Sequence, residues 1–546
     1  MNRRKTLQIL VFCSFLGTAA VWSASSLAQL PDRTRNSKFF NEGITKSLDQ
    51  QIGDGAGDIL TPNKPRYVIA RDPFRAIRRG QQLFQRKFTR DEGQGPITGN
   101  GKTNIETDIN DTSLCDNCAA CHTKRGVVGF GVDAATRRDR RDAPHLFGLG
   151  LKEMLADEIT AELRSIRAQA IQEAMSFGRE VTKSLKTSEG KGNISYGSIT
   201  ARPDGSVDTS QVIGVNRDLR VKPFFAHGDT ISIREFIVGA FDNEMGMEAV
   251  DPGLRAAASG AWFVTPSGME LDGRVDKIKA PPVNDEFHDS DKDGKVNEIP
   301  TSIVDFMEYY LLHSFKAGLG ENSPESLPPG AGYPETASPE AVDGLNKFTQ
   351  IGCATCHVQN LTINRDRRVA DVETRYDPTR GNPFNNLFAT ATTFFTQIKD
   401  GRGFPTIKQP NFGSFVVRNI FTDFKRHDLG PHFYDLNFDG RGRVQFMTTP
   451  LWGVGSTGPY GHDGRSITLK DMILRHGGEA IQSRNNFANS SPATQRNIIT
   501  FLNTLILFTP DDTASNLPGG AFSGNPRHGH GSVRLVSLFN DPKDPE

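Results

Sequence analysis

The sequence predicts a mainly α-helical protein made of two similar domains with long loops between the helices. Three observations lead to this prediction. The chain has 546 residues, which is more than a single hydrophobic core usually holds. Segments with helical hydrophobic spacing recur in the same order in its two halves. Each half also carries one copy of the pentapeptide Cys-x-x-Cys-His. The 54 glycines and 31 prolines favour long irregular connections between the helices.

The N-terminus has the features of a targeting segment. Arg3, Arg4 and Lys5 precede a mostly apolar run from Leu7 to Trp22, and Ser26-Leu27-Ala28 offers a small-x-small cleavage site. The apolar run is short for a membrane span, and no other stretch approaches the roughly 20 apolar residues that a span needs. We therefore expect residues 1–28 to be a signal peptide. The mature protein would be exported to the periplasm, without stable membrane insertion.

The charge balance says little about large partners. Lys and Arg together number 64, and Asp and Glu together also number 64. A net charge of zero gives no support to a nucleic acid or an anionic membrane surface as a general partner. Apolar residues make up 36 % of the chain and charged residues 23 %, which is ordinary globular composition.

The cysteines are arranged in a pattern typical of covalent haem attachment. Two copies of the motif occur, Cys118-Ala-Ala-Cys121-His122 and Cys353-Ala-Thr-Cys356-His357. Two thiols at this spacing reach the two vinyl groups of one haem, and the adjacent imidazole becomes an axial ligand of the iron. A redox dithiol would not need the histidine, and a zinc site would need further cysteines. The sequence thus predicts two covalently bound c-type haems, each in a cytochrome c-like domain.

Cys115 is the one other cysteine of the predicted mature chain. We expect it to be a reduced thiol without a redox role.

The two halves share a plan beyond the haem motifs. Gly80-x-x-x-Phe84 and Gly344-x-x-x-Phe348 precede them at helical spacing. Ser232 and Thr468 are expected to cap equivalent later helices. Closing helices are predicted at Ile303 to His313 and Ile498 to Phe508. The first half also carries a long helix with Leu155, Ile159, Leu163 and Ile166 on one face, followed by a predicted loop to about Val221.

A Gly/Pro/Ser-rich stretch from Gly320 to Pro339 is typical of a linker. We place the domain boundary inside it. The first domain would span residues 29–325 and hold the reactive haem, and the second would span residues 326–546 and hold the electron-transfer haem.

The second half resembles a known family. Its Thr449-Pro-Leu-Trp-Gly-Val-Gly455 run, the Pro-Tyr-Gly-His-Asp-Gly-Arg turn from Pro459 and the Leu-Arg-His-Gly-Gly-Glu-Ala run from Leu474 are similar to those of di-haem oxidoreductases. That family is related to bacterial di-haem cytochrome c peroxidases and to the di-haem enzyme that matures methylamine dehydrogenase. The resemblance implies that one haem stores electrons and the other meets peroxide or oxygen.

The resemblance also implies roles for individual residues. The peroxidases place a Met iron ligand eight residues after the threonine that begins a helix, and the equivalent position here is His476. It implies a His357/His476 pair at the electron-transfer haem. Glu244 occupies the position of the peroxidases' catalytic glutamate, although a surface glutamate at a helix end is an equally good interpretation. The peroxidases' electron-relaying tryptophan is missing at Phe225-Ala-His-Gly228, which leaves Trp452 as another route.

One acidic loop suggests a calcium site. Asp289, Asp291 and Asp293 alternate and are followed by Gly294, as in the first half of a calcium-binding loop. Pro300 stands where such loops have a bidentate glutamate, and Glu298 is a candidate substitute. A solvated acidic loop is the alternative.

The expected function is that of a periplasmic di-haem oxidoreductase that reduces peroxide. Electrons would come from a small cytochrome c, a cupredoxin or a protein substrate, and would pass from the C-terminal haem to the N-terminal haem. Two alternatives stay open. One is a non-catalytic di-haem electron carrier, and the other is a di-haem oxygenase or protein-modifying oxidase that uses oxygen.

Overall fold

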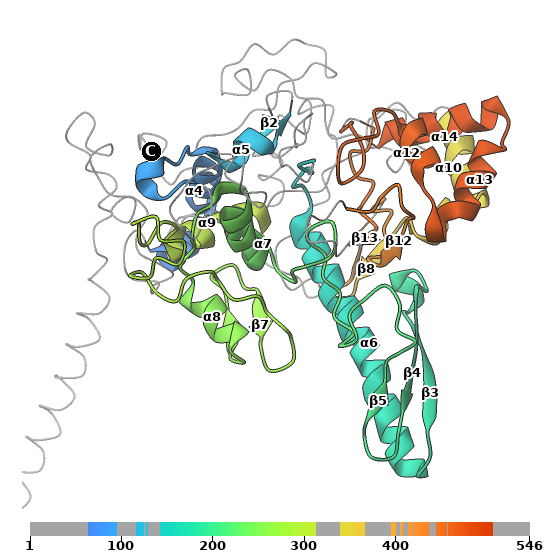
Figure 1. Ribbon diagram of the computed structural model, residues 1–546, viewed down its shortest axis with the longest axis horizontal. Coiled ribbons are helices and arrows are strands. Elements are labelled where there is room, and N and C mark those ends of the chain that lie inside the picture. Colours follow the sequence, from blue (N-terminus) through green and yellow to red (C-terminus); the bar gives the residue numbers. More distant parts are fainter. Residues whose placement is uncertain are drawn as a thin grey trace, which may run out of the picture.

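The computed structural model (Figure 1) describes residues 64–71, 73–95, 116–124, 127–128, 142–312, 339–365, 395–399, 405–407, 413–417, 419–435, 444–455 and 457–505. The predicted signal peptide, Cys115 and the predicted domain boundary at 325/326 lie outside these residues.

Helices dominate the described residues, as predicted. Those of the first half are α3 (Pro65–Arg71), α4 (Pro73–Gln85), α5 (Cys118–Cys121), α6 (Leu149–Phe177), α7 (Ile233–Ala240), α8 (Pro252–Ala258) and α9 (Thr301–Leu312). Those of the second half are α10 (Pro339–Gln350), α12 (Leu469–Arg475), α13 (Ile481–Ala488) and α14 (Pro492–Thr504). Single tight turns of helix are η3 (Arg90–Glu92), η4 (Glu189–Lys191), η6 (Cys353–Thr355) and η7 (Gly478–Ala480). The turn η5 (Phe241–Met245) is wider and of the π type.

Each half is closed by two helices that cross at a glycine. In the first half α4 packs on α9, and a side chain at Gly80 would overlap the backbone of Phe306. In the second half α10 packs on α14, and a side chain at Gly344 would overlap the backbone of Asn497. The glycines of the sequence repeat therefore allow equivalent close helix contacts, which confirms that the repeat is structural.

We expect Gly344→Ala to lower the free energy of unfolding by about 1–3 kcal/mol, because the added methyl group would force α10 away from α14. Urea denaturation of the haem-loaded protein measures this loss. Asn346→Ala, on the exposed face of the same helix, is the matched control and should change stability by less than about 0.5 kcal/mol. Equal denaturation midpoints for the two variants would contradict the close-contact explanation.

The predicted helix caps are confirmed. The Ser232 side chain accepts a hydrogen bond from the backbone N–H of Glu235 at the start of α7. The Thr468 side chain accepts one from Asp471 at the start of α12, and Asp471 bonds back to the Thr468 backbone. These reciprocal contacts satisfy backbone donors that a helix start otherwise leaves open.

A buried ion network holds α7 in place. Arg234 of α7 is fully buried and bonds Asp251 at 2.5 Å, Asp305 at 2.7 Å and Glu308 at 3.0 Å. Asp251 caps α8, and the other two acids lie on α9. Because removing one partner of such a network leaves a buried charge uncompensated, α7 and the turn that follows it are held rigidly against α8 and α9.

The long predicted helix is present as α6, and Leu155, Ile159 and Leu163 are fully buried along it. The loop predicted from its end to about Val221 was wrong, because much of this segment is a sheet. Its antiparallel strands are β3 (Val181–Lys186), β4 (Ser195–Ala201) and β5 (Val207–Asp208), and the sheet lies along the outer part of α6 (Figure 1). Gly197 interrupts the apolar alternation of β4, which explains why the pattern gave no strand prediction.

The other strands form short antiparallel pairs. They are β1 (Thr123–Lys124) with β2 (Val127–Val128), β6 (Trp262–Val264) with β7 (Glu270–Asp272), β8 (Leu361–Ile363) with β11 (Phe415–Val417), β9 (Phe395–Lys399) with β10 (Pro405–Ile407), and β12 (Arg426–Asp428) with β13 (Gln445–Met447).

The main hydrophobic core contains residues of both halves. Most of it comes from the first half, but Ile420, Met447 and Trp452 of the second half belong to the same buried cluster. A smaller core around Phe348 and Phe501 supports α10 and α14. Since the main core continues from one half into the other, the halves pack directly on each other. Among the described helices, none combines the length and apolar character needed to cross a membrane.

Candidate functional site

A large cavity lies where the two halves meet. Its volume is about 1680 Å³, and one ligand pocket typically measures about 300–1,000 Å³. Its lining includes Cys118, Cys121, His122, Glu244, Cys353, Cys356, His357, Trp452 and His476. The structure thus brings both cysteine–histidine motifs, His476 and Glu244 to one space, called here the shared cavity. Asp289, Asp291 and Asp293 are not among its lining residues.

The three histidines predicted as iron ligands are oriented in the same way. The Nδ1 atom of His122 lies 2.8 Å from the Pro144 carbonyl oxygen, that of His357 lies 3.0 Å from Phe421 O, and that of His476 lies 2.8 Å from Met472 O. Because a carbonyl oxygen only accepts hydrogen bonds, each Nδ1 must carry the proton. The Nε2 atom of each ring is then left for a metal.

The same imidazoles are held in the neutral form that ligates a metal. Burial lowers the pKa of His122 to about 4. It also lowers the pKa of His357. Burial, helped by the nearby His357 and Arg475, lowers the pKa of His476 to about 4. Neutral imidazoles bind a metal ion without first losing a proton, and the influence of His357 on His476 shows that these two rings lie near each other.

An aromatic contact repeats at the two motifs. The rings of Phe84 and His122 are 6.1 Å apart between centroids and inclined at 48°. The rings of Phe348 and His357 are 6.0 Å apart and inclined at 50°. These phenylalanines are the last residues of the repeated Gly-x-x-x-Phe segments, so the repeat places equivalent rings beside equivalent histidines.

Two of the cysteines that line the cavity, Cys118 and Cys353, are held as uncharged thiols. Burial raises the pKa of the Cys118 and Cys353 thiols to about 12. Cys118, Cys353 and Cys356 are free thiols, whereas Cys121 is in a disulfide.

Lys152 adds a positive charge to the cavity wall. Burial lowers the pKa of its ammonium group to about 8, and no carboxylate of the described residues forms an ion pair with it. An anionic group of a ligand, such as a haem propionate, would supply that missing partner. Together with the orientation of the histidines, Lys152 shows that the cavity residues fit haem.

Glu244 lies in an unusual turn of the chain. Helix α7 ends in the wide, π-type turn η5, which exposes the Asn243 and Glu244 side chains to the shared cavity. The Asn243 amide donates to the Gly239 carbonyl at 2.7 Å, and Gly246 takes a left-handed conformation (φ 64°) that ends the turn. Such π-type turns are frequent at functional sites. The structure therefore places Glu244 at a cavity wall rather than on an outer helix end.

A proton-bearing cluster of His227, Asp435 and His462 also lines the cavity. His227 Nδ1 lies 2.8 Å from the Gln445 carbonyl oxygen, and its Nε2 lies 2.6 Å from Asp435 Oδ2. The other carboxylate oxygen is 2.9 Å from His462 Nε2. Since the carbonyl fixes a proton on Nδ1, a further proton must lie between His227 and Asp435. No local sequence pattern links His227 to Asp435, because these two residues are 208 positions apart.

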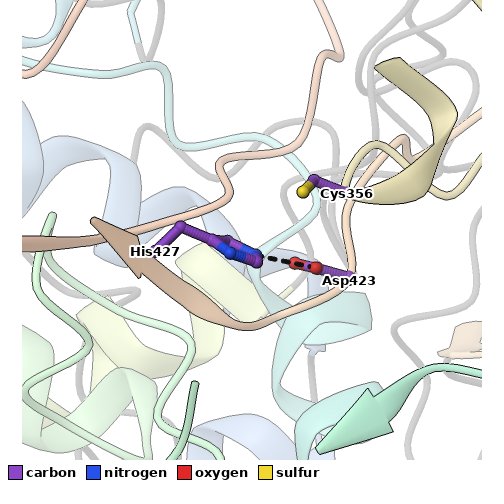
Figure 2. Close-up of side chains that lie close together, drawn as sticks. All are labelled: Cys356, Asp423 and His427. Carbon is purple, nitrogen blue, oxygen red and sulfur yellow. Dashed lines mark hydrogen bonds and ion pairs between the residues drawn. The ribbon is translucent and has the colours of Figure 1, made fainter. Parts of the chain in front are cut away.

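A second buried imidazole lies beside the second motif (Figure 2). His427 Nε2 is 2.9 Å from Asp423, and its Nδ1 is 2.8 Å from Glu479. Burial lowers the pKa of His427, but the hydrogen bond to Asp423 and the nearby Cys356 outweigh it and raise the pKa to about 11. His427, Asp423 and the Cys356 sulfur could together hold a metal ion. A Cys356 bonded to haem would leave His427 as a charged support for the motif.

Trp452 connects the surroundings of the two motifs. It is 3 % exposed, and its ring packs on Gly148, four residues after the Pro144 that holds His122. The backbone N–H of the preceding Leu451 donates to the Ile420 carbonyl at 3.1 Å, next to the Phe421 that holds His357. Trp452 thus lies between the chain segments that orient the two histidines.

Comparison with known proteins identifies the class of protein. Residues 383–505 match the family model described as "Di-haem oxidoreductase, putative peroxidase". The match includes His427, Asp435, Trp452, His462 and His476, and it confirms the resemblance found in the sequence. Residues 383–505 of this chain are therefore similar to an enzyme family, the di-haem oxidoreductases, whose members use haem. None of the curated proteins matches the chain.

Proposed function

We propose that the protein is a periplasmic di-haem c-type peroxidase with one haem in each of two cytochrome c-like domains. A cleaved signal peptide (residues 1–28) would export it, and haem would attach at the two Cys-x-x-Cys-His motifs. The observation that carries this proposal is the shared cavity, in which three neutral imidazoles turn Nε2 to the space beside both motifs. When bound, the haems supply the iron that takes up electrons and cleaves the O–O bond of a peroxide.

The two haem sites differ in the histidines available to them. The second site has the nearby pair His357 and His476, each with Nε2 unused by its backbone contact. Near His122 lies His145, whose Nδ1 accepts a hydrogen bond from the Phe147 N–H at 3.3 Å and whose ring also bonds the Trp452 backbone. Because both partners occupy its ring, His145 is not prepared as an iron ligand. We assign peroxide binding to the site of His122 and electron transfer to the site of His357 and His476.

Glu244 supplies the proton movement that peroxide reduction needs. The overall step takes one peroxide, two electrons and two protons, and it yields an alcohol or water from one oxygen and water from the other. The carboxylate of Glu244 would take the proton from one peroxide oxygen and return it to the leaving oxygen as the O–O bond breaks. Its place on the cavity wall supports this role.

The His227–Asp435 pair supplies a proton held inside the cavity. Its hydrogen bonds require one proton more than a neutral imidazole and a carboxylate would hold. His462 contacts the second carboxylate oxygen of Asp435, and it adds one further proton-carrying group to the cluster. The cluster would therefore deliver a proton to the product and be recharged from solvent through its histidines.

Electrons would pass between the haems through Trp452. Its ring packs on the segment that holds His122, and the backbone of the neighbouring Leu451 bonds the segment that holds His357. Trp452 itself lines the shared cavity. A small cytochrome c, a cupredoxin or a protein substrate would deliver the electrons to the second haem.

His476→Met is expected to raise the midpoint potential of the second haem by roughly 0.1 V or more, since axial ligands set haem potentials over about 0.8 V and Met raises them relative to His. Spectroelectrochemical titration of the purified protein measures both haems separately. Ile467→Met, an exposed site just before the same helix, controls for the added thioether. A potential unchanged in His476→Met would remove His476 from the ligand set.

Steady-state assays distinguish the three functions. The purified protein is mixed with hydrogen peroxide and a pre-reduced small cytochrome c or cupredoxin, and the oxidation of the donor is followed. Peroxide-dependent oxidation supports the peroxidase. An electron carrier would exchange electrons with the donor but leave the peroxide intact. An oxygenase or protein-modifying oxidase would consume oxygen once reduced, without needing peroxide.

A further inference from the structure

Five carboxylates gather outside the shared cavity. Oxygens of Asp289, Asp291 and Asp293 lie within 4.8 Å of one another. Oxygens of Glu248, Asp291 and Glu298 form a second group of the same size. Asp291 belongs to both groups, so the five side chains surround one small region of the protein. The sequence pattern had identified the first group and Glu298, but not Glu248, which lies 41 residues before the loop that begins at Asp289.

A buried oxygen in this cluster has no partner. Glu298 is 5 % exposed, and its Oε2 accepts the backbone N–H of Glu248 at 2.6 Å. Its Oε1 has no hydrogen-bond partner among the described residues. The same holds for Asp289 Oδ1, while Asp289 Oδ2 accepts the Gly294 N–H at 3.0 Å. Unpartnered buried carboxylate oxygens are costly, and a bound cation would remove that cost.

Gly93 packs directly against Glu298. Gly93 takes a left-handed conformation (φ 98°) directly against the Glu298 carboxylate, and a Cβ there would overlap it. Gly93 therefore lets the chain close over the cluster.

The negative charge of the cluster is not balanced by protein cations. Among the described residues, no Lys or Arg forms an ion pair with any of the five carboxylates. As a result of burial and mutual repulsion, the pKa of Asp291 rises to about 7 and that of Glu298 to about 9. Without a cation, the cluster would hold protons at neutral pH.

We propose that Glu248, Asp289, Asp291, Asp293 and Glu298 bind one calcium ion. Calcium takes six to eight oxygen ligands, including carboxylates in irregular geometry, whereas magnesium demands a near-ideal octahedron and keeps its waters. The site contains carboxylates rather than the imidazole and thiolate groups that favour transition metals. An ordinary calcium loop has a glutamate at its last position, but this chain has Pro300 there. Glu248 and Glu298 would supply the missing carboxylate oxygens instead.

The ion would fix the turn that carries Glu244. Glu248 lies three residues beyond the end of η5 at Met245. Its backbone is tied to the loop by the bond to Glu298 and by the Ile299 N–H to the Glu248 carbonyl at 3.2 Å. The Met245 carbonyl accepts the Gly95 N–H at 3.2 Å, close to Gly93. Calcium would therefore join the loop, the η5 turn and the segment at Gly93. This positioning effect rests on the proposed function, but calcium binding does not.

Direct binding measurements test the site. The full-length haem-loaded protein is freed of metal with a chelator and titrated with calcium chloride by calorimetry. We expect one ion per chain with Kd below about 10⁻⁴ M, and at least tenfold weaker binding in Glu298→Gln and Asp293→Asn. Asp293 is exposed, so its variant should fold even if Glu298→Gln does not. Asp285→Asn, exposed in the same irregular segment, is the matched control and should bind as the wild type does.

The pH dependence gives a second readout. Because calcium must displace protons from Asp291 and Glu298, its affinity should increase as pH rises from about 6 to 9. Their raised pKa values also mean that the metal-free protein loses stability as pH rises through this range, so calcium should raise the melting temperature more at pH 8 than at pH 6. No calcium binding by the wild type, or equal binding by Asp293→Asn, would overturn the proposal. Peroxide turnover is measured separately, so a protein that binds calcium without reducing peroxide refutes only the proposed function.

Discussion

Replacing His122 by glycine is expected to abolish peroxide reduction. The His122 imidazole is neutral and fixed by the Pro144 carbonyl, with Nε2 directed to the cavity side of the first motif. Without it the first haem loses its axial ligand, whereas the environment of His357 and His476 is unchanged. Absorption spectra of the oxidised and reduced variant should show one altered and one normal haem. Stopped-flow mixing with hydrogen peroxide should show no reaction.

Two comparisons make the His122 result specific. Added imidazole should enter the space left by the side chain and restore part of the activity, which a merely misfolded variant would not show. His432→Gly, an exposed position outside the cavity, should keep full activity. A His122→Gly protein that still reduces peroxide at the wild-type rate would exclude the first haem as the reactive centre.

Glu244→Gln is expected to slow the peroxide step by about 10²–10⁴-fold, the usual contribution of a general acid–base group. Glutamine keeps the shape of the side chain but cannot accept and return a proton at the same atoms. Both haem spectra and both midpoint potentials should therefore stay the same. Single-turnover stopped-flow absorbance separates this chemical step from electron delivery.

Asp242→Asn is the matched control for Glu244→Gln. Asp242 belongs to the same η5 turn and burial raises its pKa, but it does not line the shared cavity. Its variant should react with peroxide at a rate close to that of the wild type. Equal slowing in both variants would indicate a structural effect of the turn. An unchanged rate in Glu244→Gln would remove Glu244 from the mechanism.

Local patterns in the sequence predicted the parts of the site that depend on short spacing. The Cys-x-x-Cys-His motifs, the Gly-x-x-x-Phe segments and the caps at Ser232 and Thr468 each lie within a few residues. Hydrogen-bond geometry and steric exclusion act at that range, so the pattern and the structure agree for the caps and for the Gly-x-x-x-Phe segments. His476 was identified only through the family resemblance, because a histidine at a helix end has no distinctive local pattern.

Contacts between distant segments could not be predicted in the same way. Asp435 joins His227 across 208 residues, and Glu248 joins Glu298 across 50. Such pairs depend on how the whole chain packs, and a single sequence carries no local sign of it. The sheet after α6 was missed for a related reason, since Gly197 interrupts the alternation of apolar residues in β4.

The most direct test of the proposed function is stopped-flow absorbance of the purified full-length protein in the half-reduced state, mixed with hydrogen peroxide. The proposal predicts a fast Soret change at the first haem together with oxidation of the second haem, whose electron is used. No absorbance change in either haem would contradict it and would favour a closed pair of six-coordinate haems that only carry electrons.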